Sequence, residues 1–144
     1  MQNVTIHTAP DLVEVTYRPD LQAICLKWYC EYDEGDRVQQ AVHAALEFVR
    51  EQGVRNWLAD LSTSTRGLSE RDMAWVSSEA FTGAIIDSPL RRFALIPPRP
   101  ETGQDTAWLA DWEANTLAKF GDRIAAMLSD DPVAIRTFFS AADE

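Results

Sequence analysis

The sequence predicts a single α/β domain built on a mixed, mostly parallel sheet with helices packed on it. Segments of strand character alternate with segments of helical periodicity after an initial pair of strands, and such alternation is typical of parallel sheets. At 144 residues the chain has the length of one domain with a real core. We expect the order β-β-α-β-α-β-α-β-α, preceded by an N-terminal extension over about residues 1–10.

Two antiparallel strands are expected at the start of the domain. The stretch PDLVEVTYRPDL alternates apolar and polar residues and ends in a Pro-Asp turn, and QAICLKWYC alternates after it. Both cysteines, Cys25 and Cys30, fall in the second stretch at an odd separation. They would lie on opposite faces of that strand, so a disulfide between them is not expected.

A helix is predicted next, from about Asp36 to Gln52, because its apolar residues recur on one helical face. Asp36 is placed to cap its start, and Gly53 is a natural stop at its end. The stretch VRNWLADL that follows is almost continuously apolar. That character is typical of a strand covered on both faces.

A second helix is expected from Ser69 to about Asp87, begun by the capping-box-like pair of Ser69 and Asp72. The stretch RRFALIPP then predicts a buried strand, which two prolines bring to an end. A third helix is expected over roughly residues 105–119, where tryptophan and leucine residues are spaced for burial.

The last part of the chain is less clear in pattern. Residues 123–128 could form a strand or a helix, and we favour a strand because SDDP directly after them is a strong helix start. Ser129 or Asp130 would cap the final helix, and Pro132 suits its first turn.

Three stretches resemble a known family. They are AICLKWYCEYDEGDRVQQAVHAALEFVREQGV, NWLADLSTSTRGLSERDMAWVSSEAF and LRRFALIPP. Together they resemble the STAS-like proteins, the fold of sulphate-transporter C-terminal domains and anti-sigma-factor antagonists, and most of all a small bacterial branch labelled STAS/SEC14-like. The resemblance covers about residues 12–139 and rests on pattern, without a catalytic signature. It implies a non-enzymatic interaction or regulatory module that binds a protein partner through the loop 62–68 and the helix after it.

The resemblance also points to particular residues in that loop. In the antagonists the loop reads Asp-Ser-Ser-Gly-Leu or Asp-Ser-Thr-Gly-Leu, and phosphorylation of the first hydroxyl residue by a partner kinase abolishes binding. Here the comparable residues read STRGL, with Thr65 at the phosphorylated position and Ser64 in place of the Asp. The candidate phosphorylation or partner-binding residues are Asp60, Ser62, Ser64, Thr65, Arg66, Gly67 and Ser69.

Two readings of these residues stay open beside the switch. The hydroxyl side chains could simply satisfy backbone groups of a connecting loop. Asp60, near the end of an apolar strand, could order the loop by accepting hydrogen bonds or act as an acid-base group, which gives a weaker enzyme hypothesis.

Large aromatic residues give a further hypothesis from another class. The SEC14 label implies a small-molecule or lipid carrier with an apolar cavity between the sheet and the helices, lined by residues such as Trp75, Phe81, Ile85 and Trp108. Aromatic residues also anchor protein partners. The candidate interface or pocket aromatics are Trp75, Phe81, Trp108 and Trp112.

The net charge and the sequence motifs limit the kinds of partner, location and activity that we expect. A net charge of −10 disfavours nucleic acid and anionic membranes, and it favours a protein partner with a basic face. A homodimer remains open. No apolar run is long enough to span a membrane, and no secretory signal pattern begins the chain, so we expect a cytoplasmic protein. Catalytic, metal-binding and cofactor-binding motifs are missing from the sequence, so we expect no enzyme, metal or cofactor.

Overall fold

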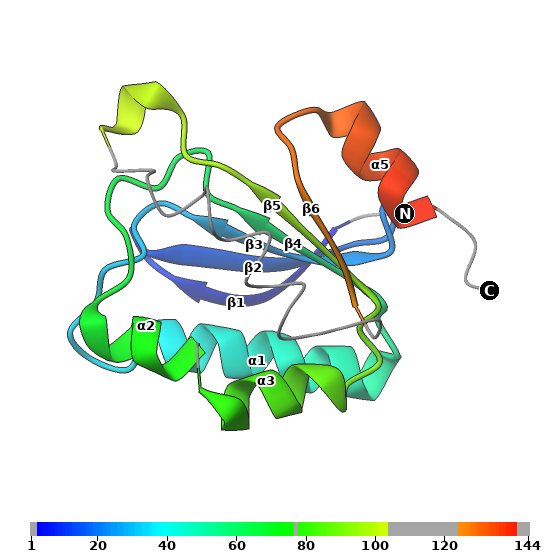
Figure 1. The fold of residues 1–144 in the computed structure, drawn as a ribbon, viewed down its shortest axis with the longest axis horizontal. Coiled ribbons are helices and arrows are strands. Elements are labelled where there is room, and N and C mark those ends of the chain that lie inside the picture. Colours follow the sequence, from blue (N-terminus) through cyan, green and yellow to red (C-terminus); the bar gives the residue numbers. More distant parts are fainter. Residues whose placement is uncertain (1–2, 77, 104–123, 141–144) are drawn as a thin grey trace.

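The computed structural model describes residues 3–76, 78–103 and 124–140, which form an α/β fold around one six-stranded mixed sheet. The strands are β1 (Val4–Ala9), β2 (Val13–Arg18), β3 (Ala23–Trp28), β4 (Asn56–Asp60), β5 (Arg92–Ile96) and β6 (Ala125–Leu128). The helices are α1 (Arg37–Gln52), α2 (Glu70–Val76), α3 (Glu79–Ile86), the short 3-10 helix η1 (Pro100–Thr102) and α5 (Pro132–Ser140). Helices α1, α2 and α3 lie on one side of the sheet and α5 lies on the other (Figure 1).

The strands are arranged in the sheet in the same order as in the sequence. β1 pairs with β2 and β2 with β3 in antiparallel fashion, whereas β3, β4, β5 and β6 are parallel neighbours. The carboxyl ends of these four parallel strands therefore meet at one edge of the sheet. In open α/β sheets this edge is where ligands and partners commonly bind.

The first strand was not expected from the sequence. Residues 4–9 pair with β2, from Val4 opposite Tyr17 to Ala9 opposite Val13, with a register irregularity between Thr5 and His7. The segment that we expected as an extension is thus an edge strand of the sheet. The β-branched residues of this segment and their alternation are typical of a strand. This pattern could have predicted β1.

The predicted hairpin of β2 and β3 is present, with Val13 opposite Trp28 and Arg18 opposite Ala23. β3 is buried on both faces because a hydrophobic cluster covers each face of the sheet. Its residues Ile24 and Leu26 belong to the core beneath α1, and Ala23 belongs to a second core on the side of α5. The two hydrophobic clusters hold the helices against the two faces of one sheet.

Helix α1 ends as predicted but is capped by a different residue at its start. Gly53 adopts φ 66°, and its N–H donates to the Val49 carbonyl. Asp36 occupies the N-cap position without a side-chain cap bond. Instead, Asp33 Oδ2 accepts hydrogen bonds from the backbone N–H groups of Gly35 and Arg37, at 3.1 Å each. Asp33 lies four residues before Arg37, the first residue of α1, and its carboxylate reaches the backbone N–H of that residue.

The single helix expected from Ser69 to Asp87 is two helices, α2 and α3. Ser69 Oγ accepts from the Asp72 N–H at 3.2 Å, which is the first half of the predicted capping box. Ser78 has extended backbone angles and caps α3 by accepting from the Phe81 N–H through its hydroxyl. A second N-cap within an apolar helical pattern therefore begins a new helix there.

Residues 125–128 form the strand that we favoured, and α5 follows it. The cap of α5 is Asp131, whose Oδ1 accepts from the Val133 N–H at 3.0 Å, so neither Ser129 nor Asp130 is the cap. The expected helix over residues 105–119, with Trp108 and Trp112, lies outside the described residues. In the ranges that the structure covers, no helix is both long and apolar enough to cross a bilayer.

Candidate functional site

The loop between β4 and α2, residues 61–69, lies at the carboxyl edge of the parallel strands and is bound to its neighbours through its backbone. The Leu61 N–H donates to the Ile96 carbonyl at 2.9 Å. The Thr65 N–H donates to the Tyr29 carbonyl at 3.1 Å, and the Glu31 N–H donates to the Arg66 carbonyl at 2.8 Å. The first bond joins the loop to the end of β5, and the other two fix it against the segment that follows β3. We call residues 61–69 the β4–α2 loop.

A buried pair of side chains lies beneath this loop. Ser64 is fully buried, and its Oγ donates to Glu31 Oε2 at 2.7 Å, with the Arg66 carbonyl at 3.3 Å. Glu31 is 7% exposed. A buried carboxylate is costly unless donors satisfy it, so Ser64 has a clear structural role. The sequence reading placed Ser64 in the site but missed Glu31, which looked like one more acid in the run EYDEGD.

The other polar residues of the predicted site also serve the loop. Asp60 Oδ1 accepts from the Ser62 N–H at 2.9 Å, which is an Asx turn at the end of β4. Thr63 Oγ1 donates to the Trp28 carbonyl at 3.0 Å. Ser62 is buried, as is Ser69, the residue that caps α2. These contacts match the reading in which hydroxyl groups satisfy a connecting loop.

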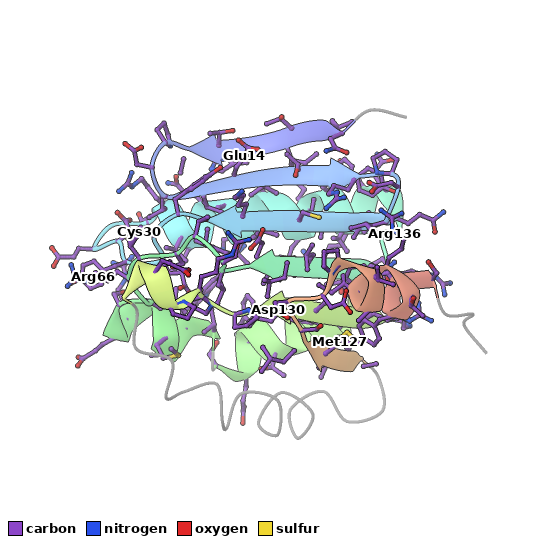
Figure 2. The ribbon with its side chains drawn as sticks, turned by 90° about the horizontal axis from the view of Figure 1, so that it is seen from above. Glu14, Cys30, Arg66, Met127, Asp130 and Arg136 are labelled. Atoms are coloured by element: carbon purple, nitrogen blue, oxygen red, sulfur yellow. The ribbon has the colours of Figure 1, made fainter. Side chains whose placement is uncertain are left out.

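Thr65 and Arg66 differ from the rest because both are exposed. Thr65 Oγ1 is 3.3 Å from the Tyr29 carbonyl, and the Arg66 guanidinium lies 3.6 Å from the centroid of the Tyr32 ring. That distance is typical of a cation–π contact. The Tyr32 hydroxyl in turn donates to Glu34 at 2.8 Å, which raises the pKa of Tyr32 above its usual value. The Arg66 guanidinium thus packs on the Tyr32 ring at the surface. Figure 2 shows Arg66 and Cys30 at one end of the sheet, with Arg136 at the other.

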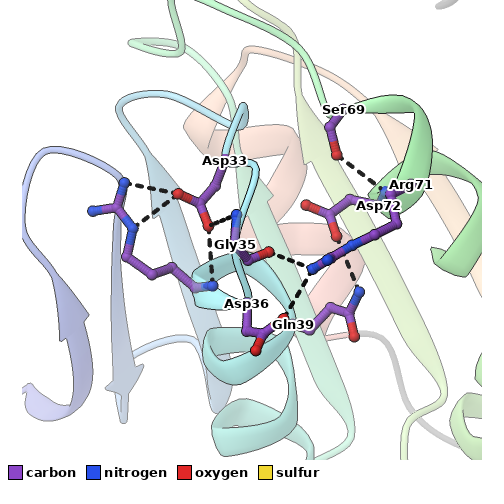
Figure 3. A network of polar contacts seen from close by, with 8 residues as sticks. Asp33, Gly35, Asp36, Gln39, Ser69, Arg71 and Asp72 are labelled. Atoms are coloured by element: carbon purple, nitrogen blue, oxygen red, sulfur yellow. Dashed lines mark hydrogen bonds and ion pairs between the residues drawn. The ribbon is translucent and has the colours of Figure 1, made fainter.

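Helix α2 is attached to the start of α1 by a polar network (Figure 3). Arg71 donates to the Gly35 carbonyl and, at 2.9 Å, to Asp36 Oδ1. Below it, the fully buried Asp72 accepts from Gln39 Nε2 at 3.1 Å. The β4–α2 loop and α2 therefore form one continuous surface together with residues 33–36.

Asp33, at the border of this network, has a lowered pKa. Arg37 donates to Asp33 Oδ1 from Nε at 3.0 Å and lies 2.9 Å from it through Nη2. Although desolvation acts to raise it, the hydrogen bonds from the Arg37 side chain and backbone hold the pKa of Asp33 below its usual 3.8. Asp33 therefore remains ionised throughout the physiological range.

Of the predicted aromatic residues, Trp75 and Phe81 lie within the described ranges, and they pack on each other. The rings of Trp75 and Phe81 meet edge to face with centroids 4.7 Å apart, and the His43 ring lies 5.3 Å from Trp75. Both aromatic side chains pack against the core beneath the sheet, and Ile85 belongs to that core with 2% exposure. These three side chains, which the carrier hypothesis placed around a cavity, contact neighbouring core residues.

The exposed residues of this region are mixed in chemistry. Met73 on α2 is 45% exposed, and Glu70 and Arg71 of the same helix are exposed as well. Among the described residues, no three histidine, cysteine, aspartate or glutamate side chains gather as a metal site. Comparisons of the chain with protein-family models, curated proteins and solved structures found no match.

Proposed function

We propose that this protein is a binding module without chemistry of its own, and that it contacts a protein partner through residues 62–68 and the start of α2. The observation that supports this most is the way the loop is held. Buried Ser64 and Glu31 fix it from below, while Thr65 and Arg66 face the solvent. A surface that is already ordered loses less conformational entropy on binding.

The charges around this surface favour a partner with a basic face. Glu34, Asp36 and Glu70 are exposed at its border, and Arg71 is already paired with Asp36. The whole chain adds a field of net charge −10. Complementary charge raises the rate of encounter and selects among partners. The exposed Met73 supplies an apolar contact beside these charges, as the centre of an interface needs.

A regulatory switch at Thr65 is part of this proposal. Of the hydroxyl residues 62–65, Thr65 alone is exposed in the described structure, whereas Ser62 and Ser64 are buried. A kinase would therefore reach Thr65 first. A phosphate there would add negative charge next to Arg66 and change the charge that the partner meets. The intact mass of the protein isolated from its native cells, followed by peptide mapping of the modified residue, tests this point, with one added phosphate on Thr65 as the expected result.

The binding function itself is tested with three variants and one captured partner. Glu70→Lys and Met73→Asp change the proposed surface, and Val133→Asp changes the 71% exposed Val133 on α5. The wild-type protein is first used to capture a partner. The purified partner should then bind the purified wild-type protein directly. Its Kd should rise by about tenfold or more for the first two variants, because Glu70→Lys sets like charge against the basic face and Met73→Asp replaces an apolar contact by a charge. Val133→Asp should leave the Kd unchanged.

Sedimentation velocity on the same variants tests the homodimer form of the proposal. A dimer that dissociates in Met73→Asp and persists in Val133→Asp would identify a second copy of the chain as the partner. The proposal is contradicted if the captured partner binds the surface variants as tightly as it binds the wild-type protein.

A further inference from the structure

A pocket lies at the opposite edge of the sheet from the β4–α2 loop. It has a volume of about 340 Å3. Its lining residues are Tyr17, Gln22, Gln52, Gly53, Val54, Arg55, Asn56, Arg92, Phe139 and Ser140. Asn56 and Arg92 are the first residues of β4 and β5, whereas Asp60 and the loop of the proposed interface come at the other end of β4. The pocket is therefore separate from the site described above.

The charge of the lining is the reverse of the charge of the chain. Two of the lining residues, Arg55 and Arg92, are cationic, and none of the ten described lining residues carries a carboxylate side chain. The chain as a whole has 23 acidic against 13 basic residues. A guanidinium group presents five N–H donors in a planar fork that matches carboxylate and phosphate oxygens. One arginine can therefore bind an anion while it keeps a protein partner.

Asn56 holds the walls of the pocket together. Its side chain is 97% buried from solvent, with 3% exposed, and its Nδ2 donates to the carbonyls of Leu21, Gln22 and Phe139 at 3.2–3.4 Å. Three surrounding carbonyl oxygens fix which end of the amide is the nitrogen. Asn56 thereby joins the β2–β3 turn to β4 and to α5. A pocket whose walls are joined in this way is formed before a ligand arrives.

The shape of the backbone also limits what the pocket holds. Gln22 and Gly53, at φ 51° and 66°, form tight turns at its rim. Helix α1 ends there at Gln52, and Ser140, the last described residue of α5, lines the pocket as well. Carbonyl groups at a helix C-terminus carry partial negative charge and attract hydrogen-bond donors. A ligand with a hydroxyl or amino group beside its anion would therefore fit this end of the pocket better than a bare anion.

We propose that this pocket binds a small organic oxyanion, a carboxylate or phosphate, with Arg55 and Arg92 contacting the anion and the helix ends accepting donors from its body. A volume of about 340 Å3 is at the lower end of the range of small-molecule sites, roughly 300–1,000 Å3. This volume suits a small metabolite.

The test uses backbone amide chemical shifts of the whole protein during titration with inorganic phosphate, acetate and glycerol 3-phosphate. Sodium chloride at matched ionic strength is the blank. We expect saturable shifts at Gln22, Gly53 and Asn56, with phosphate or acetate identifying which oxyanion is recognised. Glycerol 3-phosphate should bind more tightly than inorganic phosphate because its hydroxyl groups can donate to the helix ends.

Matched variants decide whether the arginines carry the binding. Arg55→Gln and Arg92→Gln should weaken it by about tenfold or more, since a hydrogen bond to a charged group contributes about 1.5–3 kcal/mol and 1.4 kcal/mol is a factor of ten. Arg92→Lys keeps the charge without the planar fork and should fall between wild type and Arg92→Gln. Arg99→Gln removes an exposed arginine at the other edge and should bind like the wild-type protein.

Three results would overturn the proposal. The first is that neither phosphate nor acetate gives saturable shifts at the pocket. The second is that sodium chloride gives the same shifts. The third is that Arg55→Gln and Arg92→Gln bind the anion as tightly as Arg99→Gln does. Equal affinity for inorganic phosphate and glycerol 3-phosphate would overturn the part that assigns the organic body to the pocket. The spectrum of each variant also shows whether it is folded.

Discussion

Ser64 and Glu31, 33 positions apart in the sequence, share a 2.7 Å hydrogen bond between two buried side chains. The bond joins the β4–α2 loop to the segment after β3. The Ser64 hydroxyl therefore supports the β4–α2 loop from inside the protein, although the sequence suggested that it could be modified. The exposed Thr65 and Arg66 depend on this support for their positions.

Ser64→Ala should therefore destabilise the fold by about 1–3 kcal/mol, because it removes a donor from a buried carboxylate. Thr65→Ala is the matched control: it also removes a hydroxyl from the same loop, but an exposed one, and should cost about 0.5 kcal/mol or less. Urea unfolding of both variants measures the difference. Equal free energies of unfolding for the two would show that the buried bond contributes nothing.

Asp33 gives the protein a pH dependence with a definite sign. Its pKa in the folded state lies below its usual 3.8, so the ionised form stabilises the fold. That contribution is complete above the unfolded-state pKa and is lost as the pH falls through the folded-state value. We expect Asp33→Asn to be less stable than wild type near neutral pH and to approach it in strong acid. Unfolding curves across the acid range measure this, and a gap that does not narrow would contradict the assignment.

Gln39 should matter more than its position on α1 suggests. It donates to Asp72, a fully buried carboxylate whose second oxygen has no hydrogen-bond partner among the described residues. Gln39→Met would remove that donor and should destabilise the fold by about 1–3 kcal/mol. Gln40→Met, at the exposed neighbouring position, should have little effect. Thermal unfolding of the two variants compares them, and similar melting temperatures would refute the role of Gln39.

The two cysteines should differ in reactivity. Burial of Cys25 raises the pKa of its thiol to about 12, so the thiolate that alkylating reagents need is rare. Cys30 is only half-buried and should be labelled first. Peptide mapping after brief treatment of the native protein with iodoacetamide measures the order. Labelling of Cys25 at the same rate as Cys30 would show that this face of the sheet opens readily.

Sequence patterns were sufficient for the coarse architecture and insufficient for the site. Alternating and helical periodicities placed the β2–β3 hairpin, α1 with its stop at Gly53, and the strand β6. They merged α2 with α3 into one helix and did not anticipate the N-cap at Ser78. Hydrophobic periodicity cannot register a cap whose effect depends on the backbone angles of one residue.

The partners of the site residues were beyond the reach of local patterns. The bond from Ser64 to Glu31 depends on β3 and β4 being parallel neighbours, which brings the ends of both strands to one edge. Asn56 likewise contacts residues from the β2–β3 turn and from α5. Such pairings come from topology, and a sequence shows only that polar residues occur near strand ends.

The order of the strands has a consequence for how the domain forms during synthesis. Each strand of the sheet is hydrogen-bonded to the strand that precedes it in the chain. When β2 to β6 are each synthesised, the strand that they pair with on the N-terminal side has therefore already been synthesised. The sheet can grow outward from the β1–β2 hairpin, one strand at a time, with each new contact closing the shortest loop that the topology allows.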